Sequence, residues 1–261
     1  MRILLPAGWL ACLALLGPAV LQAEPVAVRY AEAPAHSFLV LRRIDGKILA
    51  DGDLNQTARG GRVSSQVVFR FPDGSIHDET GVFSQSGHFR LLTHHVVQKG
   101  PTFPMPLDLT MSAETGRVTV RYTGGDGKEK VEDENLQLPA DVANGIMIVL
   151  LKNLSSKTVP WTVSYVAATP KPRLVKLALS ASGSEPIAGS DRRVTHFVVK
   201  AEIGGLAGLL APLAGKQPPD THVWIAEGPV PAFVKSEGPL YLGGPSWRIE
   251  PASTGRPGGK R

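Results

Sequence analysis

Short alternating runs of apolar and polar residues, divided by turn sequences, constrain this chain more than any other feature. In GRVSSQVVFRF, Val63, Val67 and Phe69 fall on one face of an extended strand. The residues FPDGS that follow contain a Pro-Asp-Gly turn signal, and a second alternating run then begins. Strands of period two joined by tight turns are typical of an antiparallel sheet with one buried face.

The same pattern recurs along the chain. In SGHFRLLTHHVV, strict alternation predicts that Leu91, Thr93 and His95 share the apolar face. Further strands are predicted in GRVTVRY, VPWTVSYVA, RLVKLALSASG, RVTHFVVKAEI, THVWIAEG and AFVKSE. The expected fold class is therefore mainly β with minor α, a curved antiparallel sheet or half-barrel, in a single β-rich domain over residues 24–250.

One apolar stretch, LPADVANGIMIVLLKNL over residues 138–154, breaks the strand pattern. Val142, Ile146 and Leu150 lie on one stripe at helical spacing, which predicts a helix that is apolar on most sides. Gly145 argues against the helix, because glycine inside a helix costs ~1 kcal/mol relative to alanine. We expect one or two apolar helices to cover the concave face of the sheet.

This helix is also expected to form one wall of a cavity. Met147 and Ile148 lie beside its main apolar stripe and are predicted to face the open space. The Gly- and Leu-rich stretch at 203–215 offers Leu209 and Leu210 as lid residues. The alternative for this stretch is a packed connection that buries its own leucines.

The first 23 residues are typical of a secretory signal peptide. Arg2 supplies the positive charge, an apolar run follows, and Leu21-Gln22-Ala23 ends in a small residue before the expected cleavage point. An uncleaved anchor is the alternative, but glycines and prolines interrupt the run. We expect an exported protein, periplasmic or secreted, with no transmembrane span after cleavage.

Composition narrows the possible partners. Cys12, inside the signal, is the only cysteine, so no disulfide is expected in the mature chain and lipid attachment is not indicated. Lys+Arg 28 against Asp+Glu 23 gives a formal charge of +5, and the basic residues are scattered, so nucleic acid is not expected as a partner. Residues 251–261 are predicted to be a disordered tail.

The seven histidines raise the question of a metal site. His94 and His95 are neighbours in a predicted strand and point to opposite faces, so they do not chelate one ion together. Cross-strand pairing leaves open a site that joins His77 to His88 or His94. The expectation nonetheless is that the chain holds no metal and no cofactor.

Catalytic motifs are not evident. His77 and Glu79 share one face of a predicted hairpin strand. They are either a general acid–base pair or ordinary polar residues of the hairpin. The sequence holds no Gly-x-Ser-x-Gly or Ser-x-x-Lys motif, and the glycines at 204–215 miss the spacing of a phosphate loop. The sequence therefore does not indicate an enzyme, and no catalytic residue is assigned.

Two Pro- and Gly-rich loops, GPTFPMPLD and EGPLYLGGPSW, carry large side chains. Phe103, Met105, Tyr241 and Trp247 are expected either to ring the mouth of a cavity or to anchor these loops to the core.

The order of elements resembles the bacterial periplasmic half-barrel proteins, which include the lipoprotein-localisation carriers. The closing segment VWIAEGPVPAFVKSEGPL resembles their late hairpin, with an aromatic-bearing strand at Trp224 and a strand that opens near Pro231. The resemblance is one of layout and transfers no binding residue. It implies a curved sheet whose hollow side takes apolar ligands such as acyl chains.

The leading prediction is a protein that binds or carries a hydrophobic or amphiphilic ligand such as a lipid, through Met147, Ile148, Leu209 and Leu210. One alternative is a non-catalytic envelope assembly or interaction protein with a protein partner. A second alternative is an extracytoplasmic hydrolase that uses His77 and Glu79.

Overall fold

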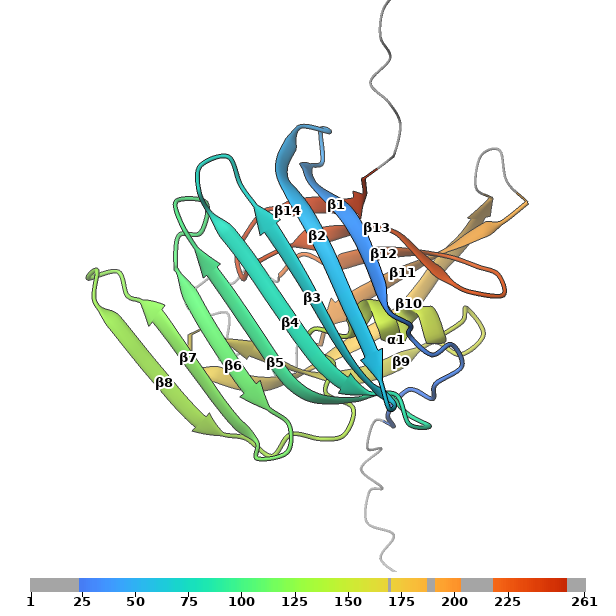
Figure 1. The fold of residues 1–261 in the computed structure, drawn as a ribbon, viewed down its shortest axis with the longest axis horizontal. Helices are drawn as coiled ribbons and strands as arrows, with labels where there is room; N and C mark the ends of the chain where they lie inside the picture. The colour runs from blue at the N-terminus through green and yellow to red at the C-terminus, as the bar shows by residue number, and fades with distance from the viewer. Residues whose placement is uncertain (1–23, 169, 187–190, 203–217, 253–261) are drawn as a thin grey trace, which may run out of the picture.

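The structure, a computed structural model, describes residues 24–168, 170–186, 191–202 and 218–252. Within these residues the chain forms one large sheet and a short helix (Figure 1). The elements are β1 (Ala35–Arg43), β2 (Ile48–Arg59), β3 (Arg62–Arg70), β4 (Ile76–Ser84), β5 (Arg90–Lys99), β6 (Leu107–Ser112), β7 (Arg117–Thr123), β8 (Glu129–Asn135), α1 (Met147–Asn153), β9 (Trp161–Ala168), β10 (Pro172–Pro186), β11 (Arg193–Ala201), β12 (Thr221–Ala226), β13 (Ala232–Pro239) and β14 (Ser246–Pro251).

The sheet consists of two meanders joined at its centre. The strand order is β8-β7-β6-β5-β4-β3-β2-β1-β14-β13-β12-β11-β10-β9, and every neighbouring pair is antiparallel. The first and last strands therefore pair, with Leu41 opposite Ile249. The half β1–β8 lies in front of the half β9–β14 in Figure 1, with α1 between them. This confirms the predicted mainly β fold with a curved antiparallel sheet.

The two edges of the sheet come close without pairing. An ion pair of 2.9 Å joins Lys171, just before β10, to Glu134 on β8. The strand β8 reads EKVEDEN, and such charge protects an exposed edge from pairing with other chains. At the other edge, Asn144 takes the place of a neighbouring strand, because its side chain bonds both the N–H (2.8 Å) and the carbonyl (2.9 Å) of Val166. The sheet is thus barrel-like but not closed.

The observed helix is shorter than predicted. It covers only Met147–Asn153 of the expected 138–154. Gly145 has a φ of 68°, a left-handed conformation that an α-helix does not contain. The side-chain amide of Asn144 forms hydrogen bonds with the backbone of β9. The segment before the helix therefore follows the edge of the sheet. The helix itself buries Val149, Leu150 and Leu151, as the apolar pattern indicates.

The predicted alternation in β5 is wrong after Leu91. The register shifts between the pairs Val82↔Thr93 and Phe83↔Leu91, so one extra residue stands on β5. Such a β-bulge reverses the alternation that follows it. As a result His94 is buried and faces inward, whereas His95 pairs with Asp108 at 3.0 Å on an exposed surface.

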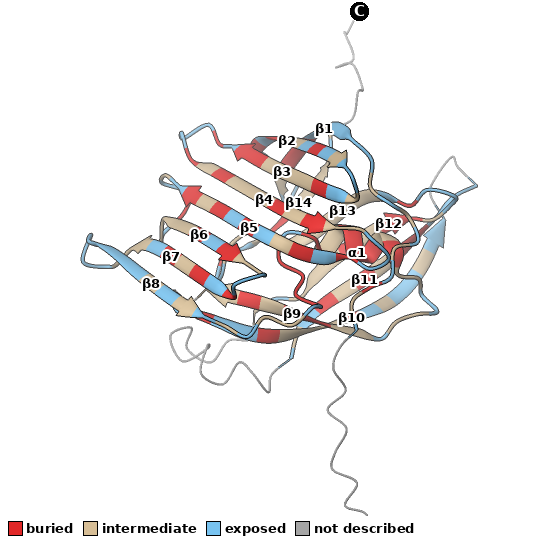
Figure 2. Cartoon of the chain, turned by 60° about the horizontal axis from the view of Figure 1, so that its bottom comes forward, coloured by how far each residue is buried: buried red, intermediate tan, exposed pale blue. Residues whose placement is uncertain are grey.

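Buried apolar residues form two main clusters, and they alternate with exposed ones along the strands (Figure 2). The larger cluster surrounds α1. The smaller one contains the contacts Phe71–Phe103 at 5.5 Å, Phe103–Tyr241 at 5.6 Å and Tyr241–Trp247 at 5.8 Å between ring centroids. These aromatic residues anchor the Pro- and Gly-rich loops to the core, as one of the two interpretations predicted.

The expected signal peptide, residues 1–23, lies outside the described residues, as does most of the expected tail at 251–261. The single domain over 24–250 stays a prediction. No helix among the residues that the structure describes is long and apolar enough to cross a membrane.

Candidate functional site

Four polar side chains gather on the inner face of β4 and β5, between the two apolar clusters. We call His77, Glu79, His94 and Gln98 the inner polar belt. The antiparallel register places His77 opposite Gln98 and Gly81 opposite His94, so the belt comes from adjacent strands. His77 lies beside the smaller cluster, 6.2 Å from Phe69 between ring centroids. The belt therefore marks the border between the two clusters.

Glu79 is the centre of the belt. Its Oε1 lies 2.8 Å from Nε2 of His94, and its Oε2 lies 3.5 Å from Nε2 of His77. Both histidine side chains are 3% exposed, whereas the Glu79 side chain is 32% exposed. The carboxylate is thus the part of the belt that a ligand can reach.

The hydrogen bonds fix which ring nitrogen of His77 carries the proton. The amide nitrogen of Gln98 lies 2.9 Å from the carbonyl oxygen of Leu240 and 3.1 Å from Nδ1 of His77. Only an N–H group satisfies the Leu240 carbonyl, so the Gln98 amide orientation is set and Nδ1 of His77 is an acceptor. The proton of a neutral His77 then lies on Nε2, which is 3.5 Å from Oε2 of Glu79 but makes no hydrogen bond within the described residues.

His94 is arranged in a similar way. Its Nε2 donates to Glu79, while its Nδ1 is buried and has no hydrogen-bond partner. A proton on Nδ1 would be a buried donor without an acceptor, which is unfavourable. Nε2 of His94 therefore donates to the Glu79 carboxylate, and Nε2 of His77 lies near the same carboxylate without a hydrogen bond.

The surroundings of Glu79 favour its ionised form. Burial by itself raises the pKa of the Glu79 carboxyl, but the neighbouring imidazoles of His77 and His94 together hold that pKa well below its usual value of 4.5. Glu79 is therefore an anion at neutral pH, and in the described part of the chain its ion pairs are with these two histidines and with no lysine or arginine.

Tyr165 lies on β9, the edge strand at the other end of the sheet from β8, and the charge of Glu79 acts on its hydroxyl. Burial, and to a smaller extent the charge of Glu79, raise the pKa of the Tyr165 hydroxyl, so it stays protonated. The side chain is only half-buried, and packs beside Val175. Its hydroxyl makes no hydrogen bond to a described residue, and so it keeps both a donor and an acceptor available.

The residues around Glu79 are apolar, and on one side of it they are incompletely packed. The cross-strand row runs Leu54, Val67, Glu79, Val96; Leu54 and Val67 are half-buried, whereas Val96 is buried. Met147 and Ile148, the helix residues predicted to face a ligand, are half-buried against the larger cluster. Leu209 and Leu210 lie outside the described residues. The interior thus combines apolar walls with the accessible carboxylate of Glu79.

The structure brings together part of the predicted chemistry. His77 and Glu79 lie close together as expected, and His94 joins them, but His88 instead forms an isolated bridge with Ala27. Among the described residues no three His, Cys, Asp or Glu side chains are grouped so that they could hold a metal ion. The inward position of His94 was not predictable, because nothing in Leu91-Leu92 marks the bulge. The roles of Gln98 and Tyr165 were not predictable either, because the residues that they interact with are distant in the chain.

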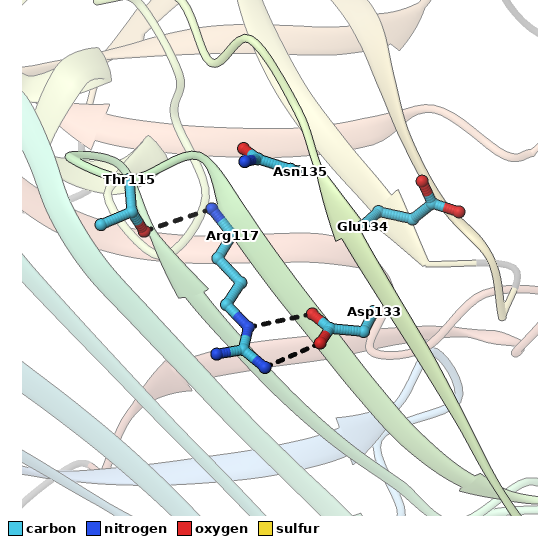
Figure 3. A pocket seen from close by; sticks show the side chains of 5 residues that line it. All are labelled: Thr115, Arg117, Asp133, Glu134 and Asn135. Carbon is cyan, nitrogen blue, oxygen red and sulfur yellow. Dashed lines mark hydrogen bonds and ion pairs between the residues drawn. The ribbon is translucent and has the colours of Figure 1, made fainter.

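A surface groove of about 320 Å³ lies at the end of β7 and β8. Its lining residues are Thr115, Arg117, Asp133, Glu134 and Asn135 (Figure 3). Arg117 donates two hydrogen bonds to Asp133, at 3.0 and 2.7 Å, and both side chains are exposed. Because these charges satisfy each other, the groove offers less for a ligand than the inner polar belt.

The fold and the inner polar belt define an open, barrel-like sheet protein whose interior is apolar except for a small group of polar side chains. No family model matches the chain, and no curated protein matches it. Among solved structures the chain is similar to a β-barrel-like protein of a domain of unknown function, DUF1849, from Brucella abortus. The two share 11% identity and a TM-score of 0.47, over 89% of this chain and 98% of that one. A likeness at this level carries no information on function, and the finer resemblance to the lipoprotein-localisation carriers stays a prediction.

Proposed function

We propose that this chain is an exported protein that binds or carries an amphiphilic ligand, with the apolar part of the ligand inside the sheet. One observation carries the proposal. Glu79 lies inside the sheet between two apolar clusters, yet its side chain is 32% exposed, and its neighbours Val67 and Leu54 on the β3 side of the row are only half-buried, whereas Val96 on the β5 side is buried. A fully packed core would bury these positions.

The energetics permit useful affinity. Burial of an acyl chain gains ~0.8 kcal/mol per methylene, so about ten methylenes offset the cost of association and leave binding in the micromolar range. The walls for this chain are the half-buried apolar residues, among them Leu54, Val67, Met147 and Ile148.

The hydrolase alternative has some support, since Nε2 of His94 lies 2.8 Å from Glu79. Two features weigh against it. Both imidazoles are almost fully buried, and the lowered pKa of Glu79 makes its carboxylate a weak general base at neutral pH. The assembly or interaction alternative becomes the better one if no amphiphile binds.

A titration with the neutral fluorescent probe N-phenyl-1-naphthylamine tests the proposal. The wild type is expected to bind the probe saturably. Ile148→Trp, which adds volume at a half-buried position of α1, is expected to weaken binding by about tenfold without unfolding the chain. Val131→Trp is the matched control, because Val131 is 53% exposed on β8. A wild type that shows no saturable binding would refute the carrier proposal.

A further inference from the structure

The inner polar belt contains a carboxylate, that of Glu79, which pairs with no lysine or arginine in the described part of the chain. Glu79 accepts a hydrogen bond from Nε2 of His94 at 2.8 Å, and Nε2 of His77 lies 3.5 Å away without a hydrogen bond, so most of the roughly four acceptor positions of the carboxylate are unused. The remaining positions belong to the exposed part of the side chain. A ligand group at this place meets a carboxylate with unused acceptor capacity.

The protein fixes this carboxylate before any ligand arrives. Gln98 holds His77, and the segment that precedes α1 holds His94, because a Cβ at Gly145 would stand only 2.7 Å from Cδ2 of His94. The belt therefore cannot turn away from the interior easily. Preorganised charges of this kind favour a partner of opposite charge, since little reorganisation accompanies binding.

Tyr165 adds a second polar contact. Its hydroxyl makes no hydrogen bond to the described residues, and Glu79 is near enough for its charge to act on that hydroxyl. An ammonium group donates up to three hydrogen bonds and accepts none, which fits a carboxylate oxygen together with a phenol oxygen. A carboxylate or phosphate headgroup would instead meet the Glu79 anion and be repelled.

From these features we infer that the ligand of the interior is a cationic amphiphile, with its ammonium group on Glu79 and Tyr165 and its apolar chain between the two clusters. This inference rests on the proposed function. It names the chemical class of the headgroup, and leaves open whether the amine belongs to a lipid or to another long-chain amine.

Displacement of bound N-phenyl-1-naphthylamine by three twelve-carbon competitors is the test. Dodecylammonium is expected to displace the probe at about tenfold lower concentration than dodecanol, and dodecanoate at about tenfold higher concentration. Butylammonium, which lacks the long chain, is expected to displace it poorly. If butylammonium acts as well as dodecylammonium, the amine site lies apart from the apolar interior and the inference is wrong.

Two variants assign the preference to the belt. Glu79→Gln is expected to bring dodecylammonium and dodecanol within about threefold of each other. Tyr165→Phe keeps the ring and is expected to weaken dodecylammonium alone by about threefold, which covers the case in which Glu79→Gln fails to fold. Asp78→Asn is the matched control, because it removes the same charge from the next residue of β4, where Asp78 faces away and bonds Gln66 at 2.9 Å. The control is expected to keep the wild-type preference.

The outcomes separate the two claims. If the probe binds but all three twelve-carbon competitors act alike, or dodecanoate acts best, the cationic headgroup is refuted while the proposed function stands. If the probe does not bind saturably to the wild type, the proposed function itself fails.

Discussion

The Nε2 atom of His94 lies 2.8 Å from Oε1 of Glu79, although the cross-strand partner of His94 is Gly81. Position 81 has no side chain, so the imidazole reaches the diagonal neighbour two residues away. The space at Gly81 is also needed by the backbone, since a Cβ there would stand 3.0 Å from the carbonyl oxygen of Gly145. Two glycines thus allow the segment before α1, the ring of His94 and the carboxylate of Glu79 to pack together.

Gly145→Ala is expected to disturb this packing. The residue has a φ of 68°, and the added Cβ would stand 2.7 Å from the His94 ring. Gly46→Ala is the matched control, because its φ is 94° and a Cβ there meets nothing within 4 Å. Urea unfolding is expected to show a loss of about 1 kcal/mol for Gly46→Ala and at least about 1 kcal/mol more for Gly145→Ala. Equal losses would show that the contact with His94 is unimportant.

Glu79 is expected to make stability depend on pH. Because its folded pKa lies below the usual 4.5, its contribution to the free energy of unfolding is fully present above that value and is lost as pH falls through the folded pKa. Urea unfolding of wild type and Glu79→Gln is expected to give a constant difference above about pH 5.5 and a smaller one near pH 3. A difference that grows as the pH falls would contradict the assignment of Glu79 as a stabilised anion.

Alternation and turn chemistry made most strands of β3–β7 and β9–β13 predictable, because each such run has one apolar face and ends at a turn. Strand β8 escaped prediction because EKVEDEN has no apolar face and is held mainly by its pairing with β7. Strand β14 escaped because Trp247 follows a Gly- and Pro-rich stretch that is typical of a loop.

The site was harder to predict than the fold. The pair His77 and Glu79 is visible from the spacing of two residues on one strand. His94 faces inward only because of a bulge, which is set by pairing with β4 and not by local sequence. Tyr165 and Glu79 belong to strands β9 and β4, which are far apart in the order of the sheet, so no local pattern links them.

Leu150→Asp is expected to prevent accumulation of folded protein. Leu150 is 3% exposed within α1, and an unpaired charge at such a position costs about 3–5 kcal/mol. The control Val230→Asp places the same charge at a residue that is 72% exposed, and it is expected to change the melting temperature little. The measurements are the soluble yield and the melting temperature of both variants. An unchanged melting temperature for Leu150→Asp would show that Leu150 does not belong to the core.

Export is expected to leave a mature chain that starts at or near Glu24. The charged, apolar and small-residue regions of the first 23 residues predict this cleavage. N-terminal sequencing of the protein purified from its host is the measurement. An intact Met1 on a cytosolic protein would overturn the proposed location and weaken the proposed function.

Native mass spectrometry of the protein purified from its host, without detergent, tests the central claim most directly. Part of the wild-type protein is expected to carry an added mass of lipid size. This mass is expected to be reduced in Ile148→Trp and kept in the exposed control Val131→Trp. A wild type that carries no added mass, and that takes none up when mixed with dodecylammonium before measurement, would contradict the claim that the interior binds an amphiphile.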